Sequence, residues 1–118
     1  MKTLTDAIID AVYDEKFRAS EIYGAIFHSD LEGKSAIEKQ RDTAQREGGE
    51  FDYWFANLWA LIKQDKGDDI QIVKDKRRCL NQMLSRAENA IHQWIQVAAM
   101  CKKATETLNN RTDYEEQE

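Results

Sequence analysis

A stripe of apolar and small side chains repeats along the C-terminal half of this sequence with the spacing of an α-helix. Its members alternate four and three residues apart: Leu80, Leu84, Ala87, Ile91, Trp94, Ala98, Cys101, Thr105 and Leu108. This is the heptad pattern, in which the a and d positions face a neighbouring helix. The chain contains no proline, so no residue of that kind interrupts a long helix over about 68–110.

The apolar face of this helix is wider than a two-stranded coiled coil requires. Beside the a and d columns, the g column is also apolar or small, with Met83, Ala90, Val97 and Ala104. A third apolar column is typical of a helix within a bundle. At roughly 60 Å the helix is too long for a compact domain to cover, so we expect a second copy of the chain to meet part of it. The residues predicted for this self-association are Leu80, Leu84, Ala87, Ile91, Trp94 and Ala98.

Shorter helical patterns precede the long helix. Thr3 and Asp6 have the spacing of a capping box, which predicts one bent helix or two over residues 4–28. Ser35 and Glu38 form a second such box, and we expect the polar helix that follows to end at the adjacent glycines 48–49.

A further helix is predicted over residues 50–64. Its expected inward face consists of Phe51, Phe55, Leu58 and Ile62. Asp68 is a good N-cap for the long final helix. Together these patterns predict an all-α bundle of four or five helices that forms one domain over 1–110, followed by an acidic, disordered tail over 111–118.

Composition narrows the class of protein. The net charge is −5. No apolar run reaches the roughly 18 residues that a membrane-spanning helix needs. The first residues are too acidic to form a signal peptide. Cys79 and Cys101 lie 22 residues apart on the long helix, about 33 Å, which is far beyond the roughly 7 Å that a disulfide tolerates. We therefore expect a cytoplasmic protein that does not enter membranes.

Patterns for catalysis and cofactor binding are weak. The glycine-rich signatures of phosphate-binding loops do not occur in the sequence. Glu88 and His92 lie one helical turn apart, but the Glu-x-x-His signature of di-iron bundles is missing. We expect a protein that is not an enzyme, with no cofactor, no metal site and no catalytic residue.

Aromatic residues gather in the segment FDYWFANLW, residues 51–59. They cannot all lie on one face of a helix, because these five positions out of nine extend around more than half of its circumference. One interpretation is a helix that is buried on most sides within the bundle. The other is a partner-binding surface, since tyrosine and tryptophan dominate the energetic centres of interfaces; its anchors are Tyr53, Trp54 and Trp59.

Positive charge concentrates in the segment KDKRR, residues 74–78. Its cations have two interpretations: they contact phosphates, or they contact the acidic N-terminal region of the same or a second chain. The second needs no ligand and matches the opposite charges of the two regions, so we favour it. The residues concerned are Lys74, Lys76, Arg77 and Arg78.

These features predict a small protein-binding module, either an adaptor or an inhibitor of the immunity-protein type, which acts by occupying a partner's surface and forms a homodimer. The alternative is a dimeric DNA-binding regulator with a helix-turn-helix-like segment at 20–47, of which residues 35–47 are the reader. Nucleic-acid binding is not favoured, because residues 34–50 lack the basic excess that such modules normally show.

Overall fold

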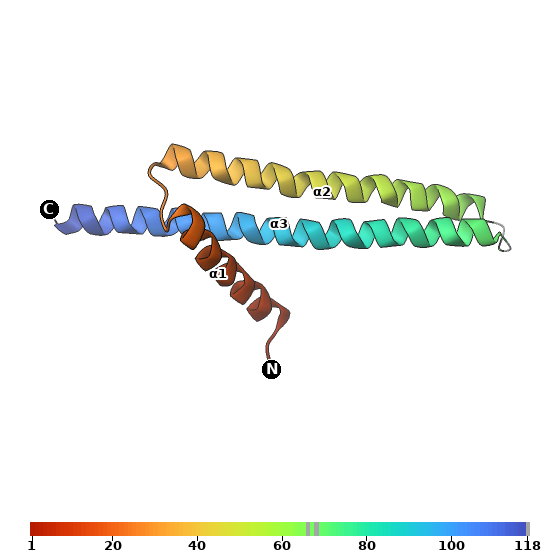
Figure 1. Ribbon diagram of the computed structural model, residues 1–118, viewed down its shortest axis with the longest axis horizontal. Helices are drawn as coiled ribbons and strands as arrows, with labels where there is room; N and C mark the ends of the chain where they lie inside the picture. The colour runs from red at the N-terminus through yellow and green to blue at the C-terminus, as the bar shows by residue number, and fades with distance from the viewer. Residues whose placement is uncertain (66, 68, 118) are drawn as a thin grey trace. The chain divides into compact units, whose positions relative to one another are not determined.

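The computed structural model describes residues 1–65, 67 and 69–117, with side chains up to Asn110. These residues form three helices: α1 (Leu4–Tyr23), α2 (Asp30–Gln64) and α3 (Ile70–Gln117) (Figure 1). No strand occurs within the described ranges. The predicted all-α class is confirmed.

The predicted number of helices, four or five, is wrong because α2 combines two of the predicted helices. It begins at Asp30, ahead of the expected capping box at Ser35. At this start the Ser29 hydroxyl accepts a hydrogen bond from the Glu32 N–H (3.1 Å), and the Glu32 carboxylate accepts one from the His28 N–H (2.7 Å). A local cap that the sequence analysis did not identify therefore sets the N-terminus of α2.

The adjacent glycines at positions 48 and 49 do not end α2, which continues through them to Gln64. The described glycines with positive φ are Gly24 (90°) and Gly67 (95°). A glycine inside a helix costs about 0.5–1 kcal/mol relative to alanine. The helix persists across this pair because tertiary packing supplies most of the stability of a protein helix.

α1 is a single helix, which decides between the two possibilities left open for residues 4–28. The predicted capping box is confirmed: the Thr3 hydroxyl accepts from the Asp6 N–H (3.1 Å), and the Asp6 carboxylate accepts from the Thr3 N–H (3.2 Å). The helix ends before Gly24, whose φ of 90° lies in the left-handed region that glycine adopts without steric cost.

α3 includes most of the predicted helix over 68–110 and continues to Gln117. The side chain of Asp69 accepts hydrogen bonds from the N–H groups of Gln71 (2.9 Å) and Ile72 (3.4 Å) and so caps the first turn. The predicted N-cap, Asp68, lies outside the described residues, as do the side chains of 111–118. The disordered tail stays a prediction.

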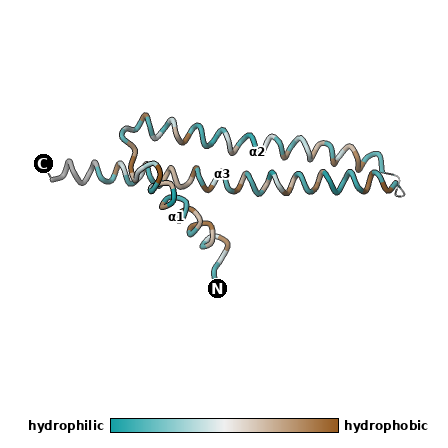
Figure 2. Tube along the Cα trace, in the orientation of Figure 1, coloured by the Kyte–Doolittle hydropathy of each residue, from teal (hydrophilic) through white to brown (hydrophobic). Residues whose placement is uncertain are grey.

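The chain divides into two compact units, one made of residues 1–42 with 93–118 and the other of residues 43–92. Helices α2 and α3 contribute residues to both units. In Figure 2, apolar and polar residues alternate along each of these helices, as the 4-3 spacing requires.

In the first unit, Phe27 anchors the connection between α1 and α2 onto α3. Its side chain is buried, and its N–H donates to the Thr107 hydroxyl (3.0 Å), which donates in turn to the Lys103 carbonyl (2.8 Å). The Lys103 ammonium lies 4.3 Å from the centroid of the Phe27 ring. A Cβ atom on Gly33 would lie 3.0 Å from that ring, so a larger residue there would have to displace the ring by a few tenths of an ångström.

α1 contacts α3 in the same unit through an ion pair and a cation–π contact, and one of its apolar residues is buried. Val12 is buried, Lys16 forms an ion pair with Glu106, and the Lys102 ammonium lies 4.2 Å from the centroid of the Tyr13 ring. Most of the apolar residues of α1 stay exposed. Its attachment therefore depends strongly on charge and cation–π contacts.

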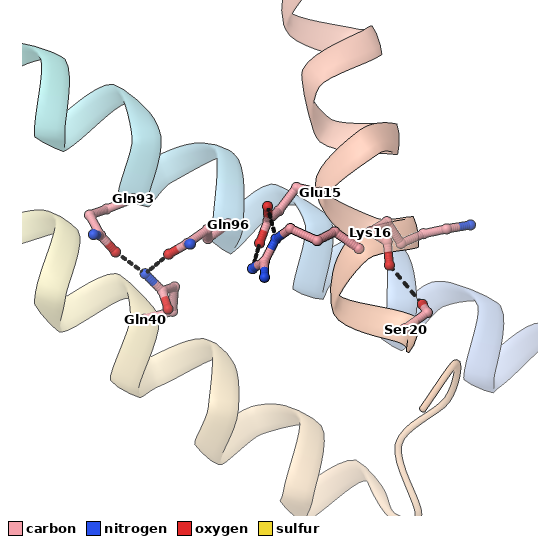
Figure 3. A network of polar contacts seen from close by, with 7 residues as sticks. Glu15, Lys16, Ser20, Gln40, Gln93 and Gln96 are labelled. Atoms are coloured by element: carbon pink, nitrogen blue, oxygen red, sulfur yellow. Dashed lines mark hydrogen bonds and ion pairs between the residues drawn. The ribbon is translucent and has the colours of Figure 1, made fainter. Parts of the chain in front are cut away.

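The part of α2 in the first unit contacts α3 through amide groups. The Gln40 side chain donates to the side-chain carbonyl oxygens of Gln93 and Gln96, at 2.8 Å for Gln96 (Figure 3). All three side chains are half-buried, where an unpaired amide would be costly. The amides therefore align α2 with α3 at this position.

In the second unit, the end of α2 and the beginning of α3 form an antiparallel hairpin. Glu47 accepts from Arg86 (3.2 Å), and Asp65 pairs with Lys76. Higher residue numbers in α2 therefore lie beside lower residue numbers in α3, as antiparallel helices require. The buried side chains are Ala44 and Cys79. Half-buried apolar residues include Phe51, Trp54, Leu58 and Leu61 of α2, with Ile72, Met83 and Ala90 of α3.

The substitution Thr107→Val should lower the free energy of unfolding by about 1–3 kcal/mol, because the buried N–H of Phe27 loses its acceptor. Thr105→Val is the matched control: the Thr105 hydroxyl also donates to a carbonyl four residues earlier, that of Cys101, but it is exposed. Urea denaturation followed by circular dichroism measures both variants. Equal losses in the two would contradict the role assigned to Thr107.

Candidate protein-interaction surface

In the second unit α3 carries two adjacent apolar stripes, and α2 covers only one of them. The covered stripe includes Cys79, Met83 and Ala90. The residue after each of these is exposed: Leu80, Leu84 and Ile91. A step of one residue turns about 100° around the helix. The predicted a and d face therefore points away from α2, and 59% of both Leu84 and Ile91 is accessible to solvent.

The six residues predicted for self-association all lie on this second stripe, but they are divided between the units. The second unit contains Leu80, Leu84, Ala87 and Ile91, and the first contains Trp94 and Ala98. The four large side chains are exposed and the two alanines are half-buried. Self-association through them stays a prediction.

Two residues of α2 that the sequence analysis placed inside the bundle add to this exposed apolar surface. Phe51 and Leu58 are half-buried as expected, whereas Phe55 and Ile62 are exposed. The Phe55 ring stacks on Phe51 with centroids 6.4 Å apart and is still 52% accessible. Phe55 and Ile62 each follow a covered residue by one position, as the exposed residues of α3 do.

The exposed apolar residues of both helices lie on the same side of the hairpin. Phe55 follows the half-buried Trp54, and Leu84 follows the half-buried Met83. Because the helices are antiparallel, the same rotation away from their mutual contact turns both residues to one side. We call this surface the two-helix face. It consists of Phe55 and Ile62 of α2 and Val73, Leu80, Leu84, Ala87 and Ile91 of α3.

The predicted partner-binding residues Tyr53, Trp54 and Trp59 do not share one surface. Trp54 is half-buried, with the Tyr53 ring edge-on at 5.3 Å. Tyr53 and Trp59 are exposed, by 61% and 53%, but the six positions between them amount to about 120° around α2. Tyr53 precedes Trp54 and therefore lies on the side of the hairpin opposite the two-helix face.

Two of the four predicted basic-cluster residues have acidic neighbours in the second unit. Lys76 pairs with Asp65, and the Arg78 guanidinium lies 3.9 Å from the Asp75 carboxylate. The acidic partner of Lys76 thus belongs to the same hairpin. The two cluster residues without an ion pair inside the described ranges are Lys74 and Arg77. Their contacts with a phosphate or an acidic partner stay a prediction.

The helix-turn-helix-like segment at 20–47 spans the end of α1 and the first half of α2. Residues 24–29 separate these helices, more than the three or four residues of the usual turn. Within and beside the predicted reader, Lys34 pairs with Glu38 (3.3 Å) and Arg41 with Asp42 (3.0 Å). These ion pairs reduce the positive charge available to phosphates, and DNA binding stays a prediction.

Among the described residues, no group of three His, Cys, Asp or Glu side chains is arranged to hold a metal ion. No helix in that part of the chain combines the length and apolarity needed to cross a membrane. Comparisons with protein-family models, curated proteins and solved structures find no match.

The ion pair near the turn of the hairpin predicts an acid-dependent contribution to stability. Hydrogen bonds from the Lys76 ammonium and from the Gly67 N–H (2.7 Å) hold the pKa of Asp65 below its ordinary value of 3.8. Because the folded-state pKa is lowered, this carboxylate stabilises the fold at neutral pH, and its contribution is lost as the pH falls through the folded-state pKa.

We therefore expect Asp65→Asn to weaken the dependence of the unfolding free energy on pH between about pH 5 and pH 2. Urea titrations at several pH values measure that dependence. Asp52→Asn on the exposed part of α2 serves as the control and should leave the acid limb steep. An unchanged slope in Asp65→Asn would show that the ion pair does not contribute to stability.

Proposed function

We propose that this chain is a small cytoplasmic protein-binding module that self-associates, and that it acts as an adaptor or inhibitor by occupying a partner's surface. The observation that carries the proposal is the two-helix face, where large apolar side chains are about half accessible to solvent. Contiguous apolar patches of more than a few hundred Å² are rare on monomers and mark interaction sites.

The dimensions of this face suit a second copy of the chain. Each of its six large apolar side chains is 44–59% accessible to solvent, and a second copy that covers all six removes them from water together. The 4-3 spacing of its α3 residues is also the spacing with which helices pack against one another. We therefore assign self-association to this face.

Two exposed aromatic residues of α2 are the proposed contacts for a different protein partner: one lies opposite the two-helix face and the other at its edge, beside Phe55. Tyr53 is exposed on the opposite side of the hairpin, which a second copy on the two-helix face leaves free. Trp59 is exposed with the Lys63 ammonium 5.6 Å from its ring centroid. Such aromatic side chains supply large contact areas with little loss of conformational entropy.

Light scattering after gel filtration should give a mass near twice 13.7 kDa for the wild-type chain. Leu84→Lys should shift the mass toward one chain, because it places a charge in an apolar contact. Ser85→Lys is the matched control, since Ser85 is exposed on another side of α3, and should leave the mass doubled. A wild-type mass of one chain at tens of micromolar would contradict the proposed self-association.

A further inference from the structure

We infer that two copies pair through both helices of the hairpin as an antiparallel four-helix bundle, with α3 against α3. The inference rests on the proposed self-association and adds the geometry of the partner. It states that α2 belongs to the interface and that the two α3 helices run in opposite directions. An interface made by α3 alone would leave Phe55 and Ile62 in water.

The contribution of α2 follows from how the hairpin distributes its side chains. Phe55 and Ile62 lie on the same side as the exposed stripe of α3, so a second hairpin that covers Leu80 and Leu84 also approaches them. The opposite side of the hairpin is largely polar and includes Arg46, Glu50, Asn57, Arg78 and Ser85. Two hairpins that meet through the two-helix face bury the apolar side of each and leave the polar sides in solvent.

The direction of pairing follows from two charged residues on or beside this face. Arg77 occupies an a position, and Glu88 directly follows Ala87, which occupies a d position. Both charged residues are exposed, and neither has an ion pair within the described ranges. Eleven residues separate them along α3, about 16 Å. They are thus too far apart to pair within one chain.

Antiparallel pairing brings these opposite charges together. When Leu80 lies opposite Leu84 of the second copy, the layers on either side match as well: Val73 lies opposite Ile91 and Arg77 opposite Ala87. The small Ala87 leaves room for the long side chain of Arg77, whose guanidinium then reaches Glu88 of the second copy. The two-fold symmetry forms this ion pair twice.

A parallel arrangement lacks this complementarity. It places Arg77 level with Arg77 of the second copy, where two like charges repel each other near an apolar contact. It also leaves each Glu88 about 16 Å along the axis from the nearest Arg77. The charges therefore favour the antiparallel arrangement and define its register.

The first test concerns α2. Phe55→Lys should weaken the dimer at least about tenfold, measured as a dissociation constant by analytical ultracentrifugation. Tyr53→Lys is the matched control, because Tyr53 lies two residues away on the same helix, is similarly exposed and faces the opposite side; its dissociation constant should equal that of the wild type. Ile62→Lys repeats the test at a second position, and circular dichroism shows that each variant keeps its helices.

The outcomes of this test separate the inference from the proposed function. If Leu84→Lys gives monomers while Phe55→Lys and Ile62→Lys dimerise as the wild type does, self-association stands and the two-helix interface is refuted. If the wild-type chain is itself a monomer, the proposed function fails and the inference fails with it. Equal losses in Tyr53→Lys and Phe55→Lys would also overturn the inference.

The second test is a charge exchange between Arg77 and Glu88. Arg77→Glu and Glu88→Arg should each weaken the dimer about tenfold, because each places like charges together across the interface. The double variant should return to within about threefold of the wild-type dissociation constant. Additive losses in the double variant would overturn the antiparallel register, since only residues in contact across the interface compensate each other.

Discussion

The second unit depends on one constraint: α3 has two adjacent apolar stripes, and a hairpin has only one other helix with which to cover them. α2 covers the stripe that contains Cys79 and Met83, which leaves Leu84 and Ile91 in water. The same constraint applies to α2, where Trp54 is covered and Phe55 is not. A two-helix hairpin therefore cannot bury all of its apolar surface, and the proposed association follows from this surplus.

Polar pairs align the helices at positions where the apolar contact is thin. The second unit buries only two small side chains among its described residues, Ala44 and Cys79, so apolar burial alone distinguishes poorly between registers. The pair formed by Glu47 and Arg86 does distinguish them, because a shift along the helix separates its charges. The half-buried Gln40 amide has the same role in the first unit.

The sequence predicted the helical class and the long α3 well, because a 4-3 repeat without proline has few alternative structures. It did not predict which column α2 covers. The covered column is c, one residue before d, and it contains Arg86 and Gln93. Such polar residues are usually exposed, but here Glu47 binds Arg86 and Gln40 binds Gln93. The exposure of Phe55 was missed for the same reason, because it too depends on which side of a helix its neighbour covers. The adjacent glycines at positions 48 and 49 did not end α2, because packing stabilises the helix more than two glycines destabilise it.

The exposed apolar face links the folding of the chain to its concentration, because pairing of two copies would cover that face. If burial of this face in the dimer adds to the stability of the hairpin, then folding and pairing form one equilibrium, and the folded fraction rises with the total concentration of the chain. Scarce copies would spend more time open to proteases than abundant ones. Gene dosage would then set the lifetime of each molecule as well as the number of molecules.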